Sequence, residues 1–309
     1  MSGFDLITPV MLTVMTAATP LLFAALGELV TEKSGVLNLG VEGMMVVGAL
    51  AAFAVASSTG STSLGIMAGA LAGAALAFVF AFLTLTMMAN QVATGLALTI
   101  FGIGLSALVG TGFVGVALEP LGKLDIPGLS SIPVIGPVLF GQDVLVYFSF
   151  VMVGVVMWFL NSTRAGLILR AVGVSHSSAH AIGLQVLRTR YLATLFGGAM
   201  SGLGGAYLSL SYTPMWAENM TAGRGWIALA LVVFSTWRPA RLLAGAYLFG
   251  FITVVQLHAQ SAGFDVPSQV MSMLPYLATI LVLVIISRDK IKIIQNAPAS
   301  LGKPFHPAK

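Results

Sequence analysis

Residues 27–57, GELVTEKSGVLNLGVEGMMVVGALAAFAVAS, join the end of one long apolar run to the whole of a second. An α-helix needs about 20 predominantly apolar residues to cross the hydrocarbon core of a bilayer. The two runs, 6–29 and 37–57, reach that length, and the short connection between them carries Lys33. This stretch therefore predicts two consecutive transmembrane helices.

The composition of the whole chain also indicates a membrane protein. Of its 309 residues, 58% are hydrophobic and 8% are charged, and the mean hydropathy is +0.99. Soluble domains contain about 25% charged residues, so a chain with so little charge must be solvated mainly by lipid. The net charge of +4 does not point to nucleic acid, because the basic residues lie in loops between apolar runs.

Further apolar runs extend this pattern to nine predicted spans in an all-α bundle. The remaining seven are 64–86, 91–112, 143–160, 191–212, 223–237, 242–260 and 271–287. No linker divides the chain, so we expect one domain over 1–309, with an outer loop at 113–142, an inner loop at 161–190 and a tail at 288–309. The seventh span is short and flanked by Gly and Pro, which is typical of re-entrant or discontinuous helices near a pathway.

The basic residues predict the orientation of these spans. If the N-terminus lies outside, 12 of the 14 Lys and Arg residues fall on the cytoplasmic side, all except Lys123 and Arg224. Short cytoplasmic loops are enriched in basic residues, so we expect an outside N-terminus and a cytoplasmic C-terminus. The first ten residues, MSGFDLITPV, have no basic residue and do not match a cleaved signal peptide.

The inner loop contains RAVGVSHSSAHAIGL (170–184), which predicts a short capped helix. Gly173 would interrupt a helix that continues from the fifth span, and Ser175 can cap a new one. Gly183 suits the left-handed residue that ends a helix. Such a helix between two spans is either one that a cytoplasmic ATPase grips or an ordinary interfacial helix, and spacing leaves both open. Arg188 and Arg190 would then anchor the next span at the lipid headgroups.

His176 and His180 are four residues apart and share one face of this helix, a spacing compatible with a metal ion. No carboxylate, cysteine or third histidine lies nearby, and the chain has no cysteine at all. A solvated helix face is therefore favoured over a metal site, and we expect neither a metal nor a cofactor.

Glu42 and Asn38 lie within the second predicted span. A charge at that depth is costly and normally faces a cavity or a partner, and the glycines around it make the start of the span easy to unwind. Glu42 either lines a pathway or holds two helices together through hydrogen bonds. Glu28 and Glu32 lie nearer the cytoplasmic end of the first span and are expected to be interfacial.

Aromatic residues and one arginine gather near the expected outer end of the seventh span. Arg224 opens this span, with Trp226 beside it and Trp216 and Tyr212 shortly before it. Aromatic residues in such places form a belt at the headgroups, and the sharper alternative is stacking on a ring-shaped substrate. The candidate pathway residues are Asn38, Glu42, Trp216, Arg224 and Trp226.

Several catalytic motifs are missing from the sequence. There is no Walker A motif, no HExxH and no Gly-x-Ser-x-Gly elbow. We therefore expect a non-catalytic chain, and if ATP drives it, the ATPase is another chain.

Three segments resemble a known family in the same order along the chain. They are GELVTEKSGVLNLGVEGMMVVGA (27–49), RAVGVSHSSAHAIGL (170–184) and GRGWIALALVVFSTWRPARLLAGAYLFGFITVVQLHAQ (223–260). They resemble permeases of branched-chain amino acid, ribose and nucleoside ATP-binding cassette (ABC) importers, and especially the shorter permease of nucleoside importers of the simple-sugar type.

The resemblance implies features that spacing does not show. These are a type II permease fold like that of the vitamin B12 importer, a longer homologous permease as partner, cytoplasmic ATP-binding subunits, an external substrate-binding lipoprotein and a place in the bacterial inner membrane. It implies that the coupling helix is formed around Arg170, Gly173, Ser175, His176, His180 and Gly183. Permeases of the ribose type commonly have ten spans, and this chain would lack the first.

The expected function is import of a small neutral polar solute, with a nucleoside or purine favoured by the resemblance. The alternatives are a simple-sugar permease, a branched-chain amino acid permease, or an ion-coupled secondary transporter working alone. A secondary transporter would need ion-binding carboxylates at mid-membrane, for which only Glu42 is a strong candidate. An intramembrane enzyme is disfavoured by the missing catalytic constellation.

Overall fold

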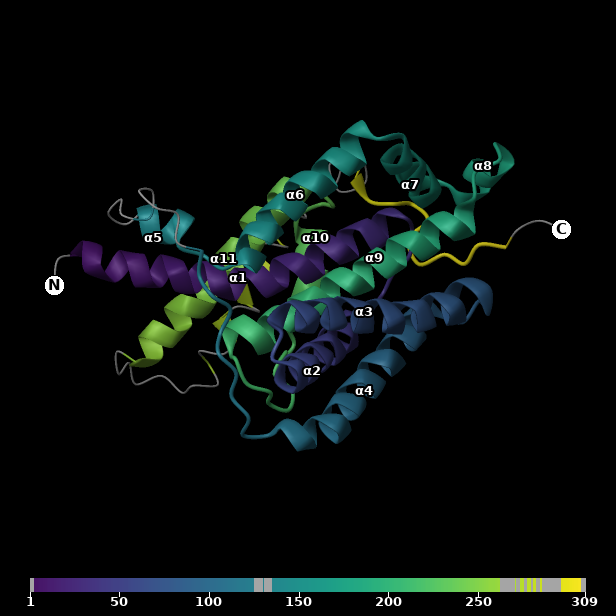
Figure 1. Ribbon diagram of the computed structural model, residues 1–309. Coiled ribbons are helices and arrows are strands. Elements are labelled where there is room, and N and C mark those ends of the chain that lie inside the picture. Colours follow the sequence, from purple (N-terminus) through teal and green to yellow (C-terminus); the bar gives the residue numbers. More distant parts are fainter. Residues whose placement is uncertain are drawn as a thin grey trace.

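The chain folds into a bundle of long helices, shown by a computed structural model that describes residues 3–124, 130, 135–261, single positions between 270 and 284, and 296–306 (Figure 1). The long helices are α1 (Gly3–Lys33), α2 (Val41–Thr59), α3 (Thr62–Ala81), α4 (Gln91–Gly110), α6 (Val144–Ser162), α9 (Val186–Tyr207) and α11 (Pro239–Ser261). The short helices are α5 (Ile135–Phe140), α7 (Arg164–Val174), α8 (His176–Ala181) and α10 (Arg224–Phe234). Two π-helical turns, η1 (Phe82–Thr86) and η3 (Leu208–Tyr212), extend α3 and α9, and the 3-10 turn η2 (Thr111–Phe113) follows α4.

Six segments of the described chain are long and apolar enough to cross a membrane. They are Thr8–Lys33, Val41–Thr59, Thr62–Thr86, Gln91–Phe113, Val144–Ser162 and Pro239–His258, which confirms six of the predicted spans within a few residues. The predicted sixth and seventh spans correspond to α9 with η3 and to the short α10, which are not among these six. The predicted ninth span, 271–287, lies for the most part outside the described residues.

Local capping explains where several of these helices begin. The side chain of Asn90 accepts a hydrogen bond from the Ala93 N–H at 3.0 Å at the start of α4. Asp143 does the same for the first turn of α6, where its Oδ1 accepts from Leu145 and Val146 at 2.9 and 3.0 Å. Such caps satisfy backbone donors that a helix leaves unpaired in its first turn.

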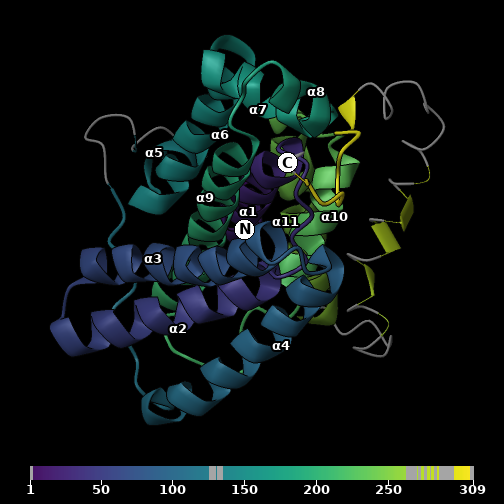
Figure 2. The same cartoon turned by 90° about the vertical axis from the view of Figure 1, so that its right-hand side faces the viewer.

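Helix α1 lies in the middle of the bundle. It packs against α9, α11, α10 and α6, and Figure 2 shows these helices beside it. Its side chains Leu22, Phe23 and Leu26 are completely buried. In contrast, Leu71 of α3 and Ile100 of α4 are exposed, as expected for outer helices whose apolar faces meet lipid.

Helices α3 and α9 meet through glycine. A Cβ atom on Gly73 of α3 would overlap the carbonyl oxygen of Gly198, and one on Gly202 of α9 would overlap that of Gly69. The two backbones approach too closely for any side chain at these positions, which is how small residues allow membrane helices to associate. This contact fixes α9, whose start carries the residues of the site described next.

Candidate functional site

The inner loop contains a break that the sequence did not predict, ahead of the expected one. Helix α6 ends at Ser162, and extended Thr163 begins α7 by accepting a hydrogen bond from the Gly166 N–H at 2.9 Å. The break expected at Gly173 is present one residue later, because α7 ends at Val174 and Gly173 lies inside its last turn. A glycine is needed there for packing, because a Cβ would overlap the carbonyl oxygen of Lys33 at the end of α1.

The short helix that follows matches its predicted caps. Helix α8 has six residues, and the Oγ of Ser175 accepts from the Ser178 N–H at 3.2 Å. Gly183, just after the helix, has a φ of +85°, the left-handed region that glycine tolerates best. The N–H of Gly183 donates to the His180 carbonyl at 2.8 Å. The predicted boundaries of this helix are confirmed.

The two histidines of α8 both face Phe305, near the C-terminus. Their ring centroids lie 5.4 Å (His176) and 5.3 Å (His180) from that of Phe305, with the rings edge to face. Nδ1 of His176 also lies 3.3 Å from Arg190. Burial lowers the pKa of His176, and the positive charges of Arg190 and Lys303 lower it further. Within the described residues, no three potential ligands cluster around a metal position.

Two arginines of this region are buried or partly buried, and for Arg190 this was not expected. Arg190, expected at the lipid headgroups, is completely buried and donates from Nε to the Ser34 carbonyl at 3.2 Å. Residues two apart on a helix point about 200° away from each other, so Arg188 and Arg190 cannot both face the lipid. That spacing was the signal that could have revealed the buried position. Arg170 of α7 is partly buried, and its Nε has no hydrogen-bond partner among the described residues.

The carboxylate of Glu42 binds the N-terminus of α10. Its Oε1 accepts from the Thr221 hydroxyl at 2.5 Å and from the Gly223 N–H at 2.9 Å, and its Oε2 accepts from the Gly225 N–H at 2.5 Å. Glu42 is 2% exposed. A negative charge at a helix N-terminus is stabilised by the unpaired N–H groups and by the helix dipole. From the sequence, Glu42 either lines a pathway or holds two helices together through hydrogen bonds. This geometry supplies the hydrogen bonds that the second interpretation requires.

Helix α10 is a half-length helix held at both ends by acidic residues from other helices. Its eleven residues give a length of about 16 Å, roughly half of a hydrocarbon core of about 30 Å. Beyond its C-terminal end, the Trp237 indole N–H donates to Oε2 of Glu32 at 2.6 Å. Trp237 and Thr236 both have positive φ, 53° and 51°, so the chain turns sharply before α11.

Glu28 and Glu32, expected to be interfacial, are buried inside the bundle at 0 and 1% exposed. Oε1 of Glu28 accepts from the backbone N–H of Asn38 at 3.1 Å. Asn38 itself lies in the non-helical connector 34–40, not within the second span, and its Oδ1 accepts from the Gly40 N–H at 2.9 Å. The connector between α1 and α2 is therefore held by a side chain of α1 and by one of its own side chains.

The remaining pathway candidates are divided between two places. Arg224 and Trp226 lie at the start of α10 beside Glu42, and the guanidinium of Arg224 lies 5.2 Å from the ring centroid of Tyr212. Trp226 is 37% exposed. Trp216 is buried and packs with Phe53 of α2, so it does not face lipid. The structure thus brings Glu42, Arg224 and Trp226 together and places Trp216 in a separate cluster.

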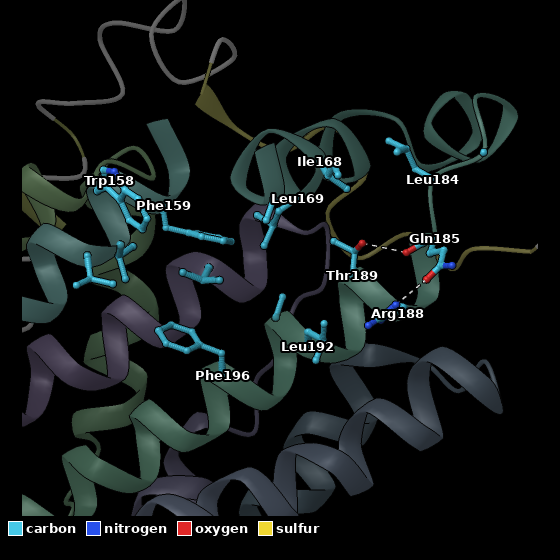
Figure 3. A pocket seen from close by; sticks show the side chains of 16 residues that line it. Trp158, Phe159, Ile168, Leu169, Leu184, Gln185, Arg188, Thr189, Leu192 and Phe196 are labelled. Atoms are coloured by element: carbon cyan, nitrogen blue, oxygen red, sulfur yellow. Dashed lines mark hydrogen bonds between the residues drawn. The ribbon is translucent and has the colours of Figure 1, made fainter. Parts of the chain in front are cut away.

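A cavity of about 680 Å³ lies beside α8, between α1, α6, α7 and α9 (Figure 3). Its walls are apolar, with Trp158, Phe159 and Phe196 among the lining residues. Polar groups are found near α8, where Arg188 donates to the Gln185 side chain at 3.3 Å. A polar solute would find few hydrogen-bond partners there, so we do not place a solute path in this cavity.

Comparisons with known proteins cover nearly all of this chain. Residues 10–285 match the sequence model of a family described as "Branched-chain amino acid transport system / permease component". The provisionally named glucose ABC transporter permease protein TsgC13 of Haloferax volcanii is 43% identical, over 86% of this chain and 88% of that protein. The nucleoside ABC transporter permease protein NupC of Lactococcus lactis is 32% identical, with the same two coverages of 86% and 88%. The guanosine ABC transporter permease protein NupQ of Bacillus subtilis is 30% identical over 93% of both chains.

The fold is also found in a solved structure. A metal-chelate type ABC transporter in an inward-facing conformation superposes with a TM-score of 0.52 and 15% sequence identity, over 90% of this chain and 85% of that chain. The expected all-α fold of type II is confirmed by this similarity.

Proposed function

Because this chain belongs to the family of branched-chain amino acid transport system permease components, we propose that it forms one half of the membrane pathway of an importer for a nucleoside. As an ABC transporter permease it is a multi-pass membrane protein and a transport subunit that works with ATP-binding subunits. The observation that carries the function is the family match over residues 10–285.

The solute is proposed from the relatives. NupC is named for nucleosides and NupQ for guanosine, at 32% and 30% identity. A simple sugar is the second candidate, because TsgC13, named for glucose, is 43% identical to this chain. Both classes are neutral and polar and carry hydroxyl groups, so a pathway lined by hydrogen-bonding groups without net charge would suit either.

The proposed contact with the ATP-binding subunits is α8, with the preceding residues Arg170 and Gly173. Helix α8 protrudes at one end of the bundle, next to the C-terminus (Figure 1). In the proposed orientation this end is cytoplasmic and the N-terminus is outside, which agrees with the basic residues. ATP is hydrolysed by the partner subunits, and a second permease and an external binding protein complete the complex.

The proposed moving part is the junction of α2 and α10. A discontinuous helix whose N-terminus ends within the membrane is typical of transport sites. Glu42 fixes that N-terminus, so α2 and α10 move together, and Arg224 and Trp226 at the same junction are the residues proposed to meet the solute. Asn38 stabilises the connector that leads into α2, because its side chain accepts a hydrogen bond from the Gly40 N–H.

The test is uptake by the complete complex in proteoliposomes. We expect ATP-dependent accumulation of labelled guanosine that requires the binding protein, with labelled glucose as the comparison solute. Accumulation of glucose but not guanosine would replace the first solute with the second. Uptake by this chain alone, driven by an ion gradient without any ATP-binding subunit, would show that the importer assignment is wrong.

A further inference from the structure

The C-terminal segment, residues 296–306, lies across the ends of four helices. In Figure 1 this yellow segment passes α7, α8 and the start of α9 after the chain has left α11. It has no regular helix beyond Asn296, yet Ser300 is 3% exposed and Phe305 is 7% exposed. A peripheral tail of this length would ordinarily be solvated, so its burial calls for a structural reason.

Ser300 joins the end of α7 to the start of α8. Its backbone N–H donates to the Gly173 carbonyl at 2.9 Å, and its hydroxyl donates to the Val174 carbonyl at 3.2 Å. The same hydroxyl accepts from the His176 N–H at 3.4 Å. These are groups that helix ends leave without a partner inside the helix. One serine from the far end of the chain therefore completes the turn between the two helices.

Phe305 provides an apolar surface against which α8 packs. Its ring packs with Val172 of α7, Ala179 of α8 and Val186 of α9 in one buried cluster. Both histidines of α8 also contact this ring. A helix of six residues is not stable in isolation and depends on packing for its position. The orientation of α8 therefore rests on Phe305.

The segment is also bonded to the connector between α1 and α2. The Gly302 N–H donates to the Gly35 carbonyl at 3.2 Å, and Lys33 donates from Nζ to the Asn296 carbonyl at 2.7 Å. The buried Arg190 joins both sides, since it donates to the Lys303 carbonyl at 3.1 Å and to the Ser34 carbonyl at 3.2 Å. This connector leads directly into α2, where Glu42 holds α10.

We propose that residues 296–306 form a clamp that fixes α8 to the α1–α2 connector, so that a displacement of α8 reaches α2 and the N-terminus of α10. Ser300 and Phe305 are positioning residues for this coupling. The inference rests on the proposed role of α8 as the contact with the ATP-binding subunits. Without the clamp, only the chain connections to α7 and α9 would hold α8, and its displacement would not be transmitted to α2.

The test compares ATP hydrolysis with solute uptake in the complete complex in proteoliposomes. For Ser300→Ala and Phe305→Ala we expect ATP hydrolysis to continue while the ATP consumed per solute imported rises about tenfold, within the usual range of coupling between sites. The matched control is Lys303→Ala, because that side chain is exposed and the hydrogen bonds of Lys303 within the clamp are made by its backbone. A wild-type ratio in both variants would overturn the proposal, and so would an equal fall of hydrolysis and uptake.

A rescue experiment tests whether a covalent link between α8 and residue 305 can replace the packing of the Phe305 ring. The chain has no cysteine, so His180→Cys with Phe305→Cys can be bridged by a short thiol-reactive linker, in a complex with cysteine-free partners. We expect bridging to lower the raised ratio of ATP to solute towards the wild-type value. A ratio that bridging leaves unchanged would refute the clamp.

A variant of α8 separates this inference from the proposed function. If Ser175→Pro uncouples the complex and the clamp variants do not, the clamp is wrong and the role of α8 stands. If Ser175→Pro leaves coupling intact, α8 is not the contact with the ATP-binding subunits, and the proposed function fails in that part.

Discussion

Glu42 shows what a single buried charge can do in a protein surrounded by lipid. Its carboxylate accepts three hydrogen bonds from one short stretch, at Thr221, Gly223 and Gly225. The sequence places Glu42 in a span and makes it a candidate for function, because charges at that depth are costly. The partners are about 180 residues away in the chain, and no local pattern points to them.

Replacing Glu42 with Gln tests this arrangement. The amide keeps one acceptor but brings an NH₂ group towards backbone donors and removes the charge at the start of α10. We expect the free energy of unfolding to fall by about 2 kcal/mol, as for a buried donor left unpaired, and ATP-dependent uptake to fall with it. Thermal unfolding of the purified complex and uptake in proteoliposomes measure the two effects.

The control for this change is Glu218→Gln, because Glu218 is exposed and lies shortly before α10. It should leave both unfolding and uptake unchanged. If Glu42→Gln behaves like this control, Glu42 has neither a structural nor a functional role at the junction.

At the scale of elements, α8 and α10 differ in how far local residues define them. Helix α8 could be predicted because Ser175 and Gly183 act on their own neighbours in the chain. The break at Thr163, before α7, was not predicted, and Gly173 beside the predicted break is also required for close packing against Lys33. For α10, the short apolar run between Gly and Pro predicted a discontinuous helix, but not what holds its ends.

The substitution Ser175→Pro should disrupt helix α8. It removes the Ser175 hydroxyl that caps the helix, worth about 1 kcal/mol, and the N–H that donates to the Ala171 carbonyl at 3.0 Å. We expect substrate-stimulated ATP hydrolysis by the complex to be lost while basal hydrolysis continues. Ser177→Ala, a change at an exposed residue of the same helix, is the control and should keep the stimulation. Normal stimulation in Ser175→Pro would remove α8 from the coupling path.

At the scale of the whole molecule, close approach of glycine backbones holds the bundle together. Repeated Gly at intervals of four predicts that helices can pack closely, but it does not say which helices meet. In the structure, α3 packs on α9, with Gly73 against Gly198. The clamp at the start of α9 then joins the C-terminal segment to the end of α1.

Adding a side chain at the contact between α3 and α9 should destabilise the bundle. Gly73→Val places a branched side chain against the backbone of α9, and overpacking of this kind costs about 1–3 kcal/mol. We expect a lower melting temperature in detergent, measured by the loss of a monodisperse peak after heating. Gly104→Ala in α4 is the control, because a Cβ there meets nothing, and alanine favours the helix over glycine. Equal melting of the two variants would show that the α3–α9 contact does not limit stability.

The sequence by itself determined that this chain enters a membrane, where most of its helices run and how α8 is capped. Hydropathy depends on the residues of one run, and a cap depends on neighbours within one turn, so both can be read without the fold. Tertiary structure decided the contacts of Glu42, Arg190 and residues 296–306. Each of them binds groups far away in the chain, and in a bundle surrounded by lipid, burial inside the protein and exposure to lipid favour the same apolar residues. The faces that meet, and the polar groups paired across them, follow only from the packed helices.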